Sequence, residues 1–513
     1  MSTRTRSHVA ATLPHVFPEV FAGTNDAAPL DLPPVTARTQ QQVGDLLVSP
    51  SYDAWTEALV RVGNCAQPIK LRGRSEMVDT TTGEIVSTYS SEQELLGVTH
   101  VRCGNRRASE CPSCSRLYAA DMFQLIRAGV AGGKTVPESV AENPLVFATL
   151  TAPSFGPVHG RRDGRRCHPY SGSEPTCEHG RARRCLAHHG EDDPALGQPI
   201  CGECYDYCSH LVWQWWAPDL WRRFTIALHR LVAKHLQLPA TRLGEVATVQ
   251  YAKVAEYQVR GVVHFHALVR LDGPRTPDGF APAPTTIDAA RLADLVRAAA
   301  TSVRLTVPGV DADDVSRILA FGRQLDARPV RSNRRTDDPD RALSPEQVAG
   351  YLAKYATKSA TGTGATDNAH HRRLRTTARD LACRAEAAQQ DPYQLLDKWT
   401  HMLGFRGHFA SKSRRYSITL GALRRARRRA QVLIAQHQAE GRPLDLSALE
   451  ADLLADDADE TTLVIGHWHF VGTGWANEAQ TVLANAAAAR AREYDRWRAE
   501  RRQTQRTTAE RTT

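Results

Sequence analysis

The chain has 513 residues and a formal net charge of +9 at pH 7, from 65 Lys and Arg against 56 Asp and Glu. This length leaves room for several domains, and the positive surplus makes a polyanion the expected partner. No stretch reaches the roughly 18 uninterrupted apolar residues of a membrane span, and the first residues lack the apolar core of a secretory signal. We therefore expect a cytoplasmic protein without a membrane partner.

Four regions follow one another along the chain. Residues 1–48 are rich in Thr, Ala and Pro and predict a disordered arm. Residues 49–143 predict a short helix, two strands joined by a Thr-Gly turn, a cysteine-bearing stretch and a second helix. Residues 144–360 open on a buried strand and contain a Cys- and His-rich insertion at about 156–210, and residues 361–513 predict a basic, mostly helical DNA-binding region.

The segment between the insertion and the linker at 272–284 predicts one helix and two strands. Residues 217–236 have the period of an amphipathic helix that begins near Pro218. Residues 245–273 predict a strand, a turn at Arg260-Gly261 and a second strand.

The second of these strands carries His264 and His266, which one intervening residue places on the same face. A turn at Arg260-Gly261 brings Glu256 and Gln258 roughly opposite them. This mixed nitrogen and oxygen set suits Mg²⁺ or Mn²⁺, with Glu256 the expected third ligand and Gln258 its nearest competitor. The alternative is a pair of ordinary half-buried strand histidines.

Residues 351–359, YLAKYATKS, lie on a helix that we expect to begin at Ser344. Tyr351 and Tyr355 are four residues apart and share one helical face with Lys358. A phenol is a poor nucleophile at neutral pH, and a nearby ammonium and a metal that polarises a phosphodiester both favour its attack. The alternative is an amphipathic helix that packs its tyrosine rings and exposes their hydroxyls.

In this order, FATLTAP, VHFHALVRLD and YLAKYATKS resemble the three motifs of the rolling-circle replication initiators, which belong to the His-hydrophobic-His (HUH) endonuclease superfamily. From about residue 95 to 475 the chain further resembles the initiators of actinobacterial plasmids and integrative elements. Segments such as CGNRRASECPSCSRLYAAD and MLGFRGHFASKSRRYSITLGALRRAR carry that likeness.

The resemblance implies an α+β fold with a central antiparallel sheet flanked by helices. It also implies that His264 and His266 bind the divalent metal and that Tyr355 nicks one DNA strand, forming a 5′-phosphotyrosine and leaving a 3′-OH primer. Relatives often carry Glu where this chain has Tyr351, so termination by a second tyrosyl transfer or by hydrolysis stays open.

The expected partners are a single-stranded or hairpin origin and, because no ATPase motif is present, a host helicase together with a polymerase. A transposase or mobilisation nickase of the same superfamily is an alternative, although the tyrosine follows the histidines here as in replication initiators. From a different class, the chain could be a zinc-containing DNA-binding regulator without catalysis.

Most of the eleven cysteines are clustered, and disulfides are rare in a reducing cytosol, so the clusters predict structural zinc. The expected ligands are Cys177, Cys185, Cys201 and Cys204, with His179 or His189 as substitutes, at one site, and Cys103, Cys111 and Cys114 with an unassigned fourth ligand at another. Cys65 and Cys383 stand apart and are expected to be plain core residues.

A dense arginine run with interleaved aromatics follows at 407–431. Arginines supply much of the sequence-independent affinity for DNA phosphates, and a solvated helix face is the alternative. The expected DNA-binding residues are Arg414, Arg415, Arg424, Arg425, Arg427 and Arg428.

Overall fold

The computed structural model describes residues 35–94, 96–134, 136–162, 164–170, 172–277, 279–330, 345–356, 368–389, 391–441 and 462–512. The chain divides into two units, one comprising Met1–Tyr118 with Ala455–Thr513 and the other Ala119–Leu454. We expected a boundary near residue 360, but the unit that holds the histidine strands continues to Leu454. The C-terminal residues after it belong with the N-terminal strands.

The first unit is built on a four-stranded antiparallel sheet in the order β13–β1–β2, with β3 also paired to β1. A small core gathers around Trp55 and Trp475, whose rings meet edge to face at 5.7 Å. The elements are α2 (Ala37–Leu47), α3 (Tyr52–Arg61), β1 (Ile69–Asp79), β2 (Ile85–Ser90), η2 (Ser91–Gln93), β3 (Thr99–Val101), β13 (Thr462–Thr473) and α11 (Glu478–Thr512), and α4 (Pro112–Ala131) runs from this unit into the second.

Two elements of the first unit differ from expectation. The arm expected to be disordered contains α2, which is capped by Thr36, whose side chain accepts a hydrogen bond from the Thr39 N–H. The C-terminal region expected to be mostly helical contains β13, which pairs with β1 along its whole length. Its β-branched and aromatic residues are typical of a strand, but this signal was masked by the basic helical segments on either side.

The second unit is built on a five-stranded antiparallel sheet in the order β11–β4–β6–β5–β12. This confirms the expected mixed architecture of antiparallel strands and helices. The elements are η3 (Glu138–Glu142), β4 (Leu145–Leu150), α5 (Tyr207–His235), η4 (Ala240–Glu245), β5 (Thr248–Tyr257), β6 (Val263–Asp272), β7 (Arg275–Thr276), β8 (Gly279–Phe280), α6 (Ala289–Ser302), β9 (Leu305–Val307), β10 (Arg317–Leu319), β11 (Leu325–Pro329), α7 (Pro345–Ala356), α8 (Ala369–Ala387), η5 (Asp391–Tyr393), η6 (Asp397–Met402), β12 (Ala410–Lys412) and α9 (Leu420–Glu440).

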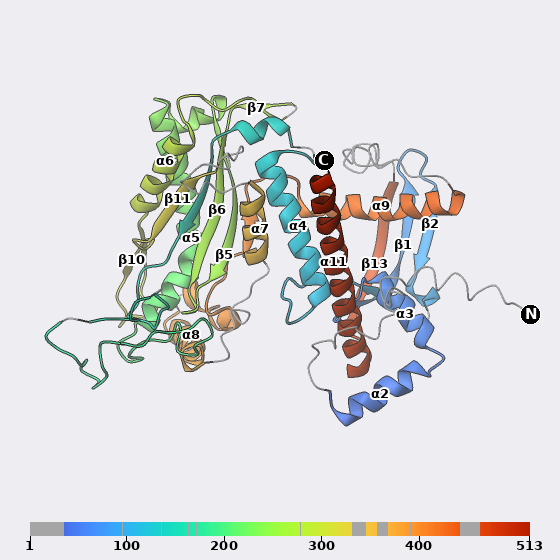
Figure 1. Cartoon of the computed structure of the whole chain (residues 1–513), viewed down its shortest axis with the longest axis horizontal. Coiled ribbons are helices and arrows are strands. Elements are labelled where there is room, and N and C mark those ends of the chain that lie inside the picture. Colours follow the sequence, from blue (N-terminus) through green and yellow to red (C-terminus); the bar gives the residue numbers. More distant parts are fainter. Residues whose placement is uncertain are drawn as a thin grey trace, which may run out of the picture. The chain divides into compact units, whose positions relative to one another are not determined.

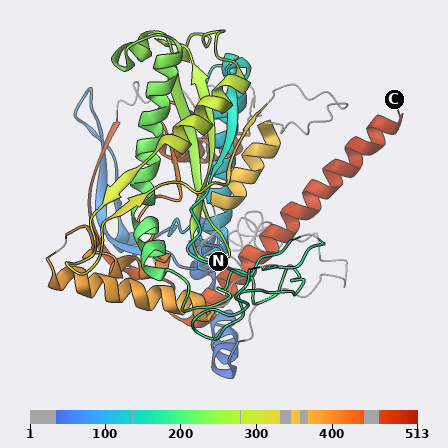
Figure 2. The same ribbon diagram turned by 90° about the vertical axis from the view of Figure 1, so that its left-hand side faces the viewer.

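The two faces of this sheet have different partners. Phe265, Ala267 and Val269 point to one face and join the main core, which α5 and α6 cover (Figure 2). The residues that alternate with them point to the opposite face, where α7 packs beside β5. Figure 1 shows α6 and α7 on opposite sides of the strands. The histidines therefore lie on the face that receives the tyrosine helix.

Helix α5 begins eleven residues before the proline at which we expected it to start, so that Pro218 lies inside it. The missed signal is Asp206, whose side chain accepts a hydrogen bond from the Ser209 N–H and caps the helix. Proline removes one helical hydrogen bond. Arg406 stabilises this turn, because its guanidinium donates to the Trp215 carbonyl at 3.0 Å and to the Asp219 carboxylate at 2.5 Å.

In the part of the chain that the structure describes, every helix is too short or too polar to span a bilayer.

Candidate functional site

Three ligand-type side chains converge on the α7 side of the second sheet. Glu256 on β5 is the cross-strand partner of His264 on β6, and His266 lies two residues further along the same face. The Glu256 Oε2 atom is 2.9 Å from His264 Nε2 and 3.0 Å from His266 Nε2. The two histidine Nε2 atoms are themselves 3.0 Å apart. We call Glu256, His264 and His266 the EHH group.

These distances fit a divalent cation held at the centre of the EHH group. Adjacent ligands of an octahedral ion with bonds of about 2.1 Å lie about 3.0 Å apart, whereas tetrahedral ligands with the same bonds lie about 3.4 Å apart. The donor set of two imidazoles and one carboxylate suits Mn²⁺ and related ions. The side chains of Glu256, His264 and His266 are only 12%, 15% and 4% exposed, so this charged group lies in a recess.

Neighbouring side chains orient His266. The Thr149 hydroxyl on β4 lies 3.1 Å from His266 Nδ1. If Nδ1 carries the proton and donates to this hydroxyl, Nε2 presents its lone pair to the EHH group, which is the usual arrangement around a metal-binding histidine. The Phe147 ring stacks on the His266 ring at 5.7 Å and limits its rotation.

Of the two expected tyrosines, only Tyr351 has a side chain among the described residues. The Tyr351 ring on α7 meets the His266 ring edge to face at 5.2 Å and the Phe147 ring at 5.7 Å. Its side chain is 38% exposed beside the EHH group. Tyr355 follows one turn later on α7, but its side chain lies outside the described residues, as does all of Lys358.

Gln258, the competing third ligand, lies away from the EHH group. Its side-chain oxygen accepts a hydrogen bond from Arg260 Nε at 2.9 Å. Gly261 has a φ of +79°, which the tight turn between β5 and β6 requires. Because Gln258 lies beside this turn and Glu256 lies opposite His264, the hairpin register favours Glu256 as the ligand.

A second group of metal ligands lies in the first unit and includes a cysteine that we expected to be a plain core residue. Cys65 Sγ is 3.7 Å from Cys111 Sγ and 3.6 Å from Cys114 Sγ, and Cys103 joins the same group. Four thiolates around a tetrahedral zinc with bonds of about 2.3 Å lie about 3.8 Å apart. Cys65 therefore takes the fourth position in this group, which spacing alone left unassigned. The hydrogen bond with Cys103 lowers the pKa of Cys111 to about 6.

The insertion contains two ligand groups rather than one. Cys177, Cys201 and Cys204 gather with His179, whose Nδ1 is 3.3 Å from Cys204 Sγ. Cys185, which we expected to complete this set, lies elsewhere. The backbones of His168 and Cys185 pair as an isolated antiparallel bridge, and this pairing draws Cys185 toward Cys167.

Cys167 and Cys185 complete a Cys₂His₂ group with His159 and His189. His159 Nδ1 is 3.2 Å from His189 Nε2, and Cys185 Sγ is 3.5 Å from the same His189 atom. On its other side, His189 donates from Nδ1 to the Asp193 carboxylate at 2.6 Å, which raises the pKa of His189. A carboxylate behind a histidine ligand is typical of zinc sites. These Cys and His groups can hold structural metal ions.

Comparison with known proteins places the chain in a family. Residues 51–489 match the family described as RepSA: Replication initiator protein, pSAM2. A replication initiator protein of Streptomyces ambofaciens is 40% identical over 476 residues, which cover 89% of this chain and 94% of that protein. The chain belongs to the replication initiator protein family. No solved structure matches it.

The arginines that we expected to bind DNA differ in their exposure and in their ion pairs. Arg427 on α9 forms an ion pair with Asp121, a buried carboxylate on α4, so its charge is already compensated within the fold. The remaining residues of the expected set are exposed, namely Arg414, Arg415, Arg424, Arg425 and Arg428.

Proposed function

We propose that this replication initiator is a metal-dependent DNA-nicking and strand-transfer enzyme of the HUH superfamily that starts rolling-circle replication. The observation that carries the proposal is the convergence of two imidazole nitrogens and one carboxylate oxygen within 3.0 Å of one another beneath the helix that carries the tyrosines. Family membership supports a role in replication, and the EHH group supports the chemistry.

Glu256, His264 and His266 would hold Mg²⁺ or Mn²⁺, which supplies a Lewis acid for a phosphodiester oxygen. The chain's own part is to orient these ligands. Thr149 would set the tautomer of His266 by accepting a hydrogen bond from Nδ1, and the hairpin register sets the spacing between Glu256 and His264. Helix α7 packs on this face and places the Tyr351 ring beside the His266 ring.

In the proposed reaction the phenol oxygen of Tyr355 loses its proton and attacks phosphorus, forming a P–O(Tyr) bond. The bond from phosphorus to the 3′ oxygen of the preceding nucleotide breaks, and that oxygen takes up a proton. The product is a 5′-phosphotyrosine and a free 3′-OH that a host polymerase extends, while a host helicase unwinds the duplex. Lys358 would lower the pKa of the attacking phenol by its positive charge.

Tyr351 has two possible roles in this scheme. As a second nucleophile it would accept the strand in a second transfer and close the displaced circle. As a packing residue it would hold His266 through the ring contact at 5.2 Å. The first role predicts a separate covalent adduct and the second predicts none.

We further propose that the three cysteine-containing groups bind structural zinc. Their closed sets of four ligands leave no open position for a substrate. The insertion has little regular secondary structure, so two metal ions would supply much of the stabilisation that a small core cannot.

Single-stranded oligonucleotides that tile both strands of the replicon's origin test the proposal. With Mn²⁺ or Mg²⁺ present, wild-type protein should cleave one of them and migrate as a covalent adduct on a denaturing gel. Tyr355→Phe should lose the adduct, and Tyr494→Phe, a tyrosine on α11 of the other unit, should keep it. An adduct that persists in Tyr355→Phe but is lost in Tyr351→Phe would reassign the nucleophile. DNA binding without cleavage of any origin fragment would instead support the zinc-containing regulator.

A further inference from the structure

A cavity of about 1130 Å³ opens beyond the ends of β4 and β5. Thr151 and Gln258 line it, and each comes directly after the last residue of its strand. Thr149 and Glu256, which belong to or contact the EHH group, lie only two residues before them. The cavity therefore begins close to the EHH group on two neighbouring strands.

Several chain segments form the walls of this cavity. The loop 153–160 is held against the end of the insertion by hydrogen bonds of 2.8 Å in both directions, from Gly197 N–H to the His159 carbonyl and from His159 N–H to Gln198. Gly197 has a φ of +77°, and a Cβ there would lie 2.5 Å from the Val259 carbonyl carbon, so this contact requires glycine. The segment 321–324 and the β5–β6 turn at 258–260 also line the cavity.

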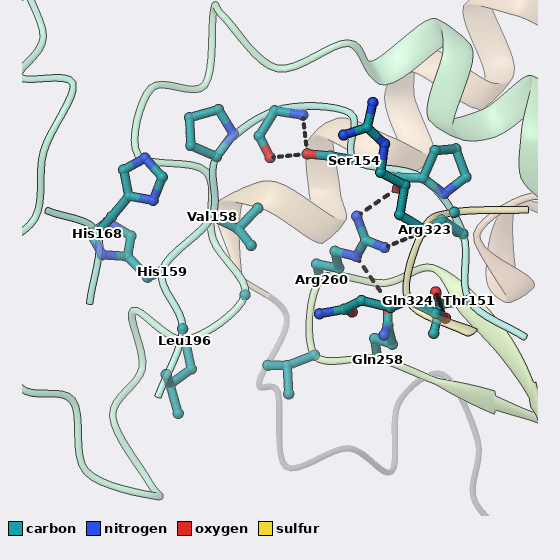
Figure 3. Close-up of a pocket in the computed structure, with 18 of the residues that line it drawn as sticks. Thr151, Ser154, Val158, His159, His168, Leu196, Gln258, Arg260, Arg323 and Gln324 are labelled. Carbon is teal, nitrogen blue, oxygen red and sulfur yellow. Dashed lines mark hydrogen bonds between the residues drawn. The ribbon is translucent and has the colours of Figure 1, made fainter. Parts of the chain in front are cut away.

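The lining is basic, although Arg161 forms an ion pair with Glu191. Five arginines, two histidines and no carboxylates line the cavity. Figure 3 shows Arg260 extending toward the loop that carries Ser154, with Gln258 beneath it. Arg260 donates to the Pro153 carbonyl at 2.9 Å and to the Ala152 carbonyl at 3.3 Å. These neutral partners fix the guanidinium in place but leave its positive charge uncompensated.

Two further arginines, Arg162 and Arg323, are exposed at the rim. Among the residues that the structure describes, neither forms an ion pair with a carboxylate. They contrast with Arg427, whose charge is compensated by Asp121. Unpaired arginines beside a concave surface attract phosphates and add little to folding stability.

The interior can recognise a base. The Gln258 and Gln324 side chains both line the cavity, and amides match the hydrogen-bonding edges of bases. Phe321 adds an aromatic surface beside them. Ligand pockets for small molecules occupy about 300–1000 Å³, so this cavity has room for at least one nucleotide with its base.

The wall of the cavity is tied to one of the cysteine groups. His159 and Cys167 both line the cavity and both belong to the Cys₂His₂ group. The Gly160 N–H also donates to Cys167 Sγ at 3.3 Å. The loop that carries Arg162 therefore starts and ends at residues of this group.

We propose that this cavity is the subsite for the single DNA strand next to the scissile phosphate, with Arg162 and Arg323 on its phosphates and one base unstacked against Gln258 and Gln324. The inference rests on the proposed nicking function. It adds where the strand lies and which residues contact its phosphates and its base. A duplex would not enter in this way, because its bases stay paired and stacked.

The salt dependence of binding tests the phosphate contacts. Affinity for a fluorescent single-stranded oligonucleotide is measured by anisotropy over a range of NaCl concentrations, without added divalent cation or chelator. Each lost phosphate contact lowers the slope of log K against log salt by about 0.7. Arg323→Ala should lower it by that amount, and the Arg162→Ala/Arg323→Ala double variant by about 1.4. Arg291→Ala, an exposed arginine on α6 on the other side of the sheet, should leave it unchanged.

Single abasic substitutions on either side of the mapped nick test the base contact. In wild-type protein one position should weaken binding by about tenfold, as expected for loss of a base contact. In Gln258→Ala/Gln324→Ala the intact oligonucleotide should bind about tenfold more weakly, and the abasic substitution should then have no further effect.

The two proposals can fail separately. Unchanged slopes in both arginine variants, with the covalent adduct still formed, would overturn the cavity as a strand subsite and leave the nicking function intact. Reduced slopes without any adduct would support the strand subsite and refute the nicking chemistry. Equal abasic effects in wild type and the glutamine variant would overturn the base contact.

Discussion

Glu256 and His264 are cross-strand partners whose side chains bring Oε2 and Nε2 within 2.9 Å of each other. This contact depends only on the hairpin register, because a shift by one residue would turn one of the two side chains to the core face. The hydrogen-bonded pairing of β5 with β6 therefore fixes where Glu256 lies relative to His264.

Glu256→Gln should abolish stabilisation of the protein by Mn²⁺. A ligand at 100 times its Kd stabilises the native state by about 2.7 kcal/mol, and Gln supplies a neutral amide in place of a charged ligand. Thermal unfolding with and without Mn²⁺ measures this, and cleavage should be lost together with the shift. Gln258→Glu is the matched control, since this position lies outside the EHH group and should keep the shift. An equal shift in wild type and Glu256→Gln would remove Glu256 from the metal site.

Thr149→Val should weaken Mn²⁺ binding by about 10- to 100-fold without removing a ligand. The hydroxyl that lies 3.1 Å from His266 Nδ1 is lost, while the side-chain volume is nearly kept. Titration calorimetry measures the affinity. Raising the Mn²⁺ concentration should restore cleavage in Thr149→Val but not in His266→Ala. Wild-type affinity in Thr149→Val would show that this hydroxyl does not orient the histidine.

Cys65→Ser should reduce the zinc content by one ion per chain. The structure places this cysteine in the group with Cys103, Cys111 and Cys114, so its removal leaves three ligands. Elemental analysis of purified protein should give about three zinc ions for wild type and two for the variant, if each group of four holds one ion. Cys383→Ser, an exposed cysteine outside the groups, should retain all three. Equal contents in Cys65→Ser and Cys383→Ser would contradict the assignment.

Because His370 is buried in its neutral form, the free energy of unfolding should fall in mild acid. Burial lowers the pKa of His370 from 6.5 to about 4, and the neutral ring bonds both the Arg260 carbonyl and the Tyr207 hydroxyl. Between these pH values the unfolded state binds more protons than the folded state, so stability falls as pH falls, by up to about 1.4 kcal/mol per pH unit. His371 and Arg260 add positive charge near the ring.

Urea unfolding at pH 7 and pH 5 measures this effect. His370→Gln should be less stable at pH 7 but lose less stability on acidification than wild type does. Because both proteins carry the same cysteine and histidine groups, the difference between their pH dependences isolates His370. Parallel pH dependences would show that another group titrates.

Asp272→Asn should destabilise the second unit by about 3–5 kcal/mol, the cost of leaving a buried charge without its partner. Arg270 and Asp272 are both fully buried and form two hydrogen bonds of 2.7 and 2.8 Å. Urea unfolding measures the loss. Replacing both residues with apolar side chains of similar volume should cost less than the sum of the single changes, whereas additive costs would rule out a coupled pair.

The local geometry of the site could be predicted from short stretches of sequence. Alternation along a strand puts His264 and His266 on one face, and the Arg260-Gly261 turn sets which residue lies opposite. The same local rules located α7 and the spacing of Tyr351. At Pro218 the local Asp206 cap was missed, and the side chain that stabilises the proline turn, Arg406, comes from far along the chain.

The sequence by itself determined the β5–β6 hairpin, the tyrosine helix and the presence of clustered cysteines, since each depends on residues within a few positions of one another. Only the tertiary structure decided that Cys65 joins Cys111, that Cys185 pairs with Cys167 instead of Cys177, and that β13 completes the N-terminal sheet. Some of these contacts join segments that are distant in sequence. Others join residues of the irregular insertion in an alternating order. No local period encodes such contacts, because they depend on which surfaces pack together once the chain has folded.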